Sequence, residues 1–124
     1  MGARRRWGWL GVVLWSAVLF WQSASSGDGS LFALLPAGSD KVAHAFAYLV
    51  LGGLAALATG SRAGGALLAV LYGISDEIHQ SFVPGRTPEL WDLVADASGA
   101  LVGAWLAFWL VRNPCRRRRE PTLE

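Results

Sequence analysis

Residues 93–111 read LVADASGALVGAWLAFWLV, and this stretch decides how the chain can fold. A helix rises 1.5 Å per residue, and the hydrocarbon core of a bilayer is about 30 Å thick, so a crossing helix needs about 20 apolar residues. The stretch has about that length, and Asp96 is its only charged residue. It is therefore predicted to span a membrane.

Three further apolar runs precede this one, and they differ in quality. The run 42–59 is long and apolar enough to span. The run 7–21 is short, and the second half of 64–82 carries polar residues. We predict an all-α, integral membrane four-helix bundle. Its expected spans are 7–21, 42–59, 64–82 and 93–111.

The segments between these runs support the same division. Residues 22–41 are rich in Ser, Gly and Ala and are predicted to form a loop. Residues 60–63 form a short turn, and the prolines and glycine of 83–91 end one helix and delay the next. The chain is thus one membrane domain at 7–112. A basic cytoplasmic segment flanks it on each side, at 1–6 and at 113–124.

The composition also argues against a soluble domain. Of 124 residues, 53% are hydrophobic and only 16% are charged. A small soluble domain has too much surface for its volume to bury so many apolar side chains. A lipid bilayer is the expected partner of these side chains. The single cysteine, Cys115, excludes an internal disulfide and is expected to be a cytosolic thiol without a role.

The first run has a second interpretation that the residues leave open. Three arginines, a short apolar core and the small residues 23–25 also describe a signal peptide. Cleavage would leave three spans and place the new amino terminus outside the cell.

The basic residues predict the orientation. With four spans, nine of the eleven basic residues fall on the side of the termini, and only Lys41 and Arg86 fall on the other. Cytoplasmic loops are enriched in Lys and Arg, so both termini are predicted to be cytoplasmic, as in a multi-pass protein of the cell membrane. Basic tails also occur in nucleic-acid-binding proteins, but here each cluster adjoins an apolar run, and no nucleic-acid partner is expected.

This topology gathers the remaining polar residues in one layer near the outer face. A buried Asp costs about 2.5–3.5 kcal/mol at mid-membrane, so a chain that carries several must pair, hydrate or use them. Singly, residues such as Asp40 and Asp92 can be interfacial charges, and a lone His is more often a packing residue. The expected ligand-binding residues are Asp40, Lys41, His44, Tyr48, Asp76, Glu77, His79, Gln80, Arg86, Asp92 and Asp96.

Helical spacing places many of these residues on shared faces. The three residues 40, 44 and 48 follow an i, i+4, i+8 pattern. Asp76, His79 and Gln80 share a face with Tyr72, and Glu77 lies about 100° away, the rotation per residue of a helix. On the last helix, Asp92 and Asp96 continue into Gly99 and Gly103, a Gly-xxx-Gly pair that allows close approach of another backbone.

The same residues resemble the VanZ-like family of small bacterial membrane proteins. The matching stretches are 40–48 (DKVAHAFAY), 73–86 (GISDEIHQSFVPGR) and 92–103 (DLVADASGALVG). The family's pattern usually has Asn at the position of Asp96 and often Ser near Glu89. The founding member is linked to resistance toward the glycopeptide teicoplanin, so the resemblance implies an envelope role that can include glycopeptide susceptibility.

Three functions fit these features. In the first, Arg86 or Lys41 binds an anionic cell-envelope or lipid-linked ligand, and Asp76, Asp92 and Asp96 hold the cation in place. In the second, an enzyme acts on a lipid-linked phosphate or peptidoglycan precursor. The candidate catalytic residues for it are His44, Asp76, His79 and Arg86.

In the third, the protein is a structural or assembly subunit that dimerises through Gly99 and Gly103. No cofactor is expected, and no metal, because the two histidines stand on different helices and no ligand spacing supports one. The sequence leaves the substrate, the reaction and the oligomeric state open, and a homo-oligomer is compatible with it.

Overall fold

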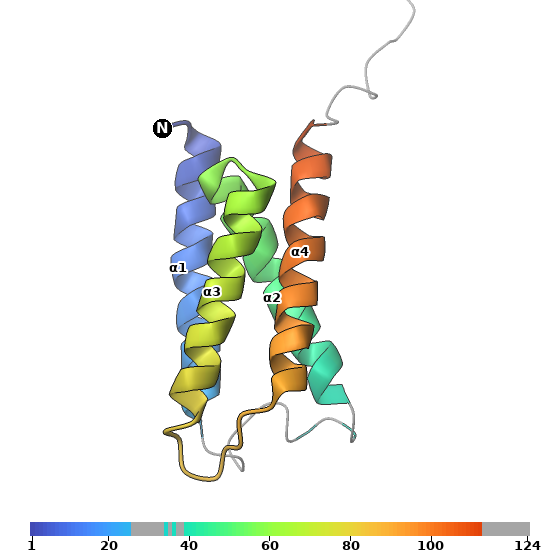
Figure 1. Cartoon of the computed structure of the whole chain (residues 1–124). Helices are drawn as coiled ribbons and strands as arrows, with labels where there is room; N and C mark the ends of the chain where they lie inside the picture. Colours follow the sequence, from blue (N-terminus) through green and yellow to red (C-terminus); the bar gives the residue numbers. More distant parts are fainter. Residues whose placement is uncertain (26–33, 35, 37–38, 113–124) are drawn as a thin grey trace, which may run out of the picture.

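The computed structural model describes residues 1–25, 34, 36 and 39–112. These residues form four α-helices and no strand (Figure 1). The helices are α1 (Ala3–Ala24), α2 (Ser39–Thr59), α3 (Arg62–Gln80) and α4 (Leu90–Arg112). The all-helical prediction is confirmed. The basic tail with Cys115 and most of the first loop lie outside the described residues.

The helices α1, α2 and α4 extend beyond the apolar runs that predicted them, whereas α3 begins and ends two residues earlier than the run 64–82. The helix α1 begins at Ala3 and continues to Ala24, so it includes the arginines and part of the predicted loop. The helix α4 begins at Leu90, three residues earlier than expected. Hydropathy marks only the part of a helix that avoids water, whereas backbone hydrogen bonding continues into polar residues until a cap or proline stops it.

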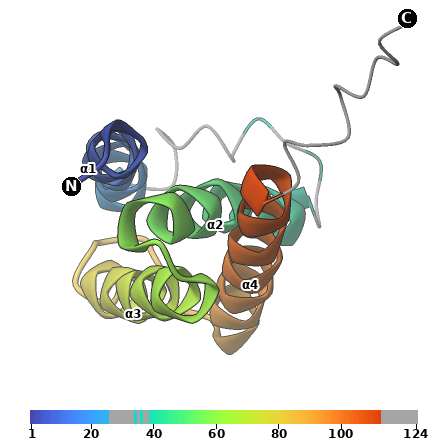
Figure 2. The same cartoon turned by 90° about the horizontal axis from the view of Figure 1, so that it is seen from above.

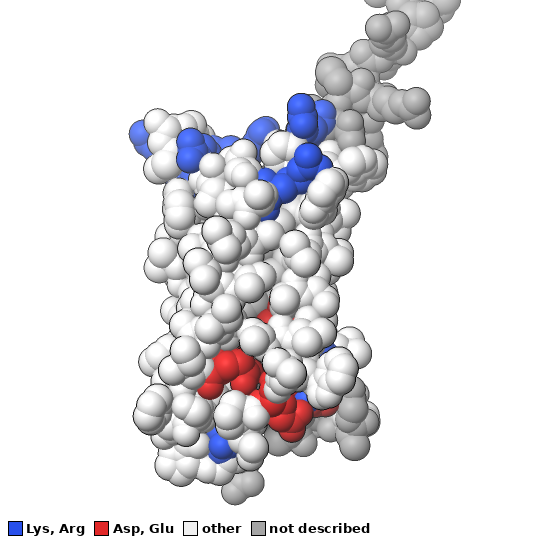
Figure 3. Space-filling model, in the orientation of Figure 1, with Lys and Arg blue, Asp and Glu red and all other residues white. Residues whose placement is uncertain are grey.

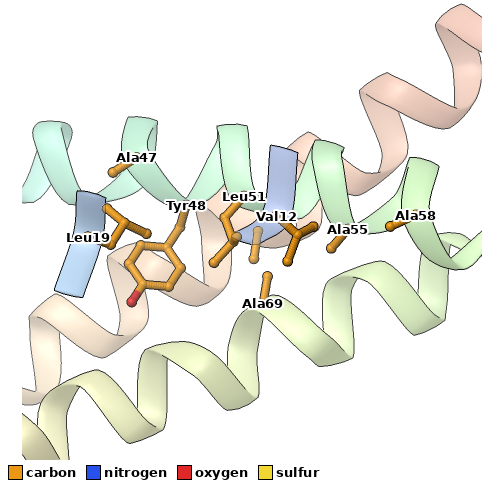
Figure 4. Packing of buried hydrophobic residues seen from close by; sticks show 9 residues of the cluster. Val12, Leu19, Ala47, Tyr48, Leu51, Ala55, Ala58 and Ala69 are labelled. Atoms are coloured by element: carbon orange, nitrogen blue, oxygen red, sulfur yellow. The ribbon is translucent and has the colours of Figure 1, made fainter. Parts of the chain in front are cut away.

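The helix α2 lies at the centre of the bundle. Seen from above, α1, α3 and α4 are arranged around it (Figure 2), and α2 contacts each of them. Its closest association is with α4. The core between these helices consists largely of alanines, with Tyr48 and Leu51 as its largest fully buried apolar side chains (Figure 4).

Small residues make this packing close. A Cβ added at Gly99 would lie 2.0 Å from the carbonyl oxygen of Ala45, and one at Gly103 would lie 1.9 Å from that of Leu49. The predicted close approach therefore occurs, and its partner is α2 of the same chain. Because α2 covers both glycines, they are not available for the dimer contact on which the third candidate function depends.

The outer surface is apolar along its length. Large hydrophobic side chains are exposed on all four helices, among them Leu14, Phe46, Leu71 and Trp109. Soluble monomers rarely expose contiguous apolar surface on this scale. Within the described residues, α2 and α4 are long and apolar enough to cross a membrane. The expectation of four spans rests on the sequence for α1 and α3.

Candidate functional site

Charged side chains separate to the two ends of the bundle (Figure 3). Arginines mark the end where α1 and α3 begin and α4 ends. The carboxylates mark the other end, where α2 and α4 begin and α3 ends. Those of the described residues are Asp40, Asp76, Glu77, Glu89, Asp92 and Asp96. We call this second end the polar end.

Lys41 lies at the centre of an ion-pair cluster on the polar end. Its Nζ is 2.9 Å from Oδ2 of Asp40 and 2.7 Å from Oε2 of Glu89, and it also contacts Oδ1 of Asp92. The cluster joins the first turn of α2 to the start of α4. Glu89 was not among the predicted site residues. Its position between Pro88 and the last apolar run was the signal that could have found it.

These contacts shift the pKa values of Asp40 and Lys41, which precede the apolar run that begins at Val42. Hydrogen bonds from Lys41 to Asp92, Glu89 and Asp40 raise the pKa of the lysine amine, against a smaller effect of burial. The hydrogen bond from Lys41 lowers the pKa of the Asp40 carboxyl, which burial opposes in part. The amine of Lys41 therefore stays protonated, and its positive charge is already paired with carboxylates.

His44 and Asp96 form a second link between α2 and α4. The Nδ1 atom of His44 is 2.9 Å from Oδ1 of Asp96, and its Nε2 atom is 3.9 Å from Oδ2 of Asp92. Asp96 is fully buried, and His44 is nearly so. Among the candidate catalytic residues, His44 is thus paired with Asp96, which was not one of them.

Asp76 contacts neighbours on α2 and α3. Its Oδ2 atom is 3.5 Å from the Tyr48 hydroxyl and 3.5 Å from Nε2 of Gln80. Beside it is a cavity of about 20 Å³ between α1, α2 and α3, which His44 and Arg86 also line. A cavity of that volume holds about one water molecule.

The first helix contributes two residues that were not among the predicted site residues. Gln22 and Ser23 are buried at the end of α1 and line the same cavity. Both lie within the segment predicted to be a loop. If the first apolar run is a retained span, its outer end lies beside the polar layer. This was the feature of the sequence from which Gln22 and Ser23 could have been predicted.

His79 lies at the edge of the site and faces α1. Its ring stacks on Phe20 with 4.7 Å between centroids, and its Nδ1 atom is 3.4 Å from the Ser23 hydroxyl. Asp76 and Gln80 are buried on the predicted face of α3, whereas His79 turns toward α1. The two histidines therefore occupy different environments.

Arg86 has a different partner from the one expected. Its Nε donates to the carbonyl oxygen of Ser25 (3.2 Å), and its Nη2 donates to that of Gln22 (2.9 Å). These are carbonyls at the end of α1, which lack partners inside the helix. Asp76, Asp92 and Asp96 were expected to hold either Arg86 or Lys41 in place. Asp92 does contact Lys41, but Arg86 is held by the end of α1.

Two buried carboxylate oxygens at the polar end have no hydrogen-bond partner among the described residues. They are Oδ2 of Asp96 and Oε1 of Glu77. An unpaired buried polar atom loses its hydration without compensation, which costs about 1–3 kcal/mol and more for charged groups.

The described residues contain no group of three or more His, Cys, Asp or Glu arranged to hold a metal ion.

Fold and site together define a class: an all-helical bundle with an apolar exterior, two helices able to cross a membrane, and a buried polar network at one end. Within that class, the chain belongs to the VanZ/LLP1 family, whose model matches residues 8–112. This match confirms the resemblance noted from the motifs. No curated protein and no solved structure matches the chain.

Proposed function

We propose that the protein crosses the membrane four times, with both termini in the cytoplasm and the polar end on the outer side. The arginines at one end and the carboxylates at the other support this orientation under the positive-inside rule (Figure 3). Contacts of α1 favour a retained first span: Trp15 donates to the carbonyl of Ala47, and Ser16 accepts from the Tyr72 hydroxyl.

We further propose that the polar end binds a primary ammonium group carried by an envelope-side ligand. The observation that carries this proposal is that one buried oxygen of Glu77 and one of Asp96 have no hydrogen-bond partner among the described residues. A primary ammonium has three N–H donors and no acceptor, which suits carboxylate oxygens that lack a donor. The ligand completes the polar network that the chain leaves incomplete.

A purely structural role accounts for part of the network only. Lys41 and His44 join α2 to α4, and Tyr48 joins α2 to α3, so these groups stabilise the bundle. Bundle stability gives no reason for the unpaired oxygens of Glu77 and Asp96, because each lowers it. A ligand group gives that reason.

The charge of the site favours a cation over the anionic ligand that the sequence led us to expect. Among the residues that the structure describes, six carboxylates and two permanent cations lie at the polar end. Both cations have internal partners: Lys41 contacts three carboxylates, and Arg86 donates to two carbonyls. An anion would have to displace these partners, whereas an ammonium would not.

The test compares two lipids that differ in the ammonium group. Purified full-length protein in detergent is titrated with phosphatidylethanolamine or phosphatidylcholine of matched chains, and thermal stabilisation is measured. We expect preference for phosphatidylethanolamine, reduced about tenfold in Glu77→Gln and Asp96→Asn, since a hydrogen bond to a charged group contributes about 1.5–3 kcal/mol. Glu89→Gln removes a charge at the same end without touching a partnerless oxygen, and it should keep the preference.

Other results would contradict the proposal. Equal stabilisation by the two lipids would exclude recognition of a lipid-borne ammonium, and stabilisation by free ethanolamine alone would point to a soluble ligand. If phosphatidylglycerol stabilised the protein preferentially, and Arg86→Gln abolished that effect, the polar end would bind an anionic ligand and not an ammonium. Glycopeptide susceptibility of cells that carry each variant would then relate the site to the envelope.

One observation favours an enzyme as the second candidate. Asp96 orients His44, as a carboxylate orients a general base, and His44 lines the water-sized cavity. Such a histidine can take a proton from water that attacks a lipid-linked phosphate or a peptidoglycan precursor. Turnover of a panel of these precursors by the purified protein, lost in His44→Gln, would support this function. Absence of turnover across the panel would exclude it.

A further inference from the structure

A second depression lies at the opposite end of the bundle, between the start of α3 and the second half of α4. Its volume is about 530 Å³, within the range of about 300–1,000 Å³ typical of small-molecule sites. We call it the basic-end groove. Its lining residues are Gly60, Ser61, Arg62, Ala63, Ala66, Leu101, Trp105 and Phe108.

The groove combines apolar walls with one cation. Leu101, Trp105 and Phe108 form its α4 side. The Arg62 guanidinium lies over two of these rings, 3.9 Å from the centroid of Trp105 and 4.9 Å from that of Phe108. The rings thus hold the guanidinium against the α4 side of the groove by cation–π contacts.

A cation–π contact does not use up the hydrogen-bonding capacity of this guanidinium. An arginine can stack on an aromatic ring and still present its N–H fork to a phosphate in the same plane. No salt bridge of Arg62 is present among the described residues. Its fork is therefore positioned without an anionic partner.

The surroundings make this end electropositive. Arg5 and Arg112 accompany Arg62, and the described residues of this end contain no Asp or Glu (Figure 3). Arg112 also lies over Phe108, 5.2 Å from its centroid. The wall of apolar side chains continues along the outside of α4 from Leu101 to Trp109. A fixed cation therefore lies beside an apolar strip.

We propose that the basic-end groove binds an anionic phospholipid, with the headgroup phosphate on Arg62 and an acyl chain along Leu101 and Trp105. Charge complementarity and the apolar continuation along α4 define this occupant. The site is separate from the polar end and does not depend on the ammonium proposal. It requires a bilayer on the apolar exterior but no particular orientation.

Native mass spectrometry of the full chain, released from detergent with added phosphatidylglycerol or phosphatidylcholine, tests the proposal. We expect phosphatidylglycerol adducts to predominate. Arg62→Gln should weaken them about tenfold, because a charge-assisted hydrogen bond is lost. Arg62→Lys keeps the charge and should retain part of the binding.

Three matched measurements make the test decisive. Arg6→Gln removes an exposed charge from the same end without touching the groove, and Leu110→Ala shortens an exposed side chain of α4 outside it; both should leave the adducts unchanged. Leu101→Ala removes part of the groove wall and should weaken them. Equal losses in Arg62→Gln and Arg6→Gln would mean diffuse surface attraction and would overturn the proposal.

Two further outcomes would also overturn it. Loss of the adducts in Arg86→Gln, with none in Arg62→Gln, would place the anionic lipid at the polar end. A dimer that Leu101→Ala dissociates would mean that a second copy of the chain fills the groove. Circular dichroism of each variant separates a binding defect from unfolding.

Discussion

His44 on α2 and Asp96 on α4 meet inside the bundle, with 2.9 Å between Nδ1 and Oδ1. The two residues are 52 positions apart in the chain, and Asp96 is fully buried. The contact joins the two helices that are long and apolar enough to cross a membrane. It is the most buried polar contact between them.

This pair gives the first prediction. Asp96→Ala should lower the free energy of unfolding by about 1–3 kcal/mol, because His44 would lose its buried partner. Asp96→Asn keeps an acceptor oxygen for His44 and should stay near the wild type. Chemical denaturation in detergent micelles measures both. In a double-mutant cycle, His44→Ala and Asp96→Ala should be strongly coupled, and additive effects would show that the contact contributes nothing.

The α2–α4 backbone contact gives the second prediction. Gly103→Ala places a methyl group 1.9 Å from the carbonyl oxygen of Leu49, so the helices must separate. We expect a loss of about 1–3 kcal/mol, typical of overpacking. Gly64→Ala is the control, because its nearest neighbour is 3.4 Å away and Ala is the better helix former. Equal thermal midpoints for the two variants would contradict this packing.

Lys41 gives a prediction that depends on pH. Lys41→Met should destabilise the protein by about 1 kcal/mol near neutral pH, since most of the paired side chains are partly exposed and screened. The pKa of Asp40 in the folded protein is below its ordinary value of 3.8. The ion pair of Asp40 with Lys41 therefore stabilises the folded protein fully above about pH 5. This stabilisation is lost as the pH falls through the lowered pKa of Asp40.

The difference in the free energy of unfolding between wild type and Lys41→Met should accordingly be constant near neutral pH and become smaller in acid. Lys41→Arg keeps the charge and serves as the control. Unfolding followed by tryptophan fluorescence over a pH series measures the difference. A gap that widens on acidification would contradict the assignment.

The proposed orientation gives a fourth prediction. In a Cys115→Ser background, Thr87→Cys lies in the α3–α4 loop and Ala63→Cys lies at the start of α3, both at exposed positions. A membrane-impermeant maleimide should label Thr87→Cys on intact cells and Ala63→Cys only after permeabilisation. The reverse pattern would invert the topology. Labelling of both positions on intact cells would exclude a bundle that crosses the bilayer.

Most of the helical framework could be predicted from the sequence. Apolar runs, prolines and short turns located α2, α3 and α4 to within a few residues, because a long apolar helix has a length and composition that no loop shares. The family followed from the three motifs, and the match over residues 8–112 confirms it. Periodicity also placed Asp92, Asp96, Gly99 and Gly103 on one buried stripe.

What the sequence could not decide is which helix each polar group faces. Helical phase gives the direction of a side chain relative to its own axis, but the partner depends on how the helices are arranged around α2. Only the tertiary structure paired Asp96 with His44, turned His79 toward α1 and assigned Arg86 to the carbonyls of Gln22 and Ser25. Composition and spacing determined that costly polar groups share one end. Packing decided which of them are paired and left oxygens of Glu77 and Asp96 without partners among the described residues.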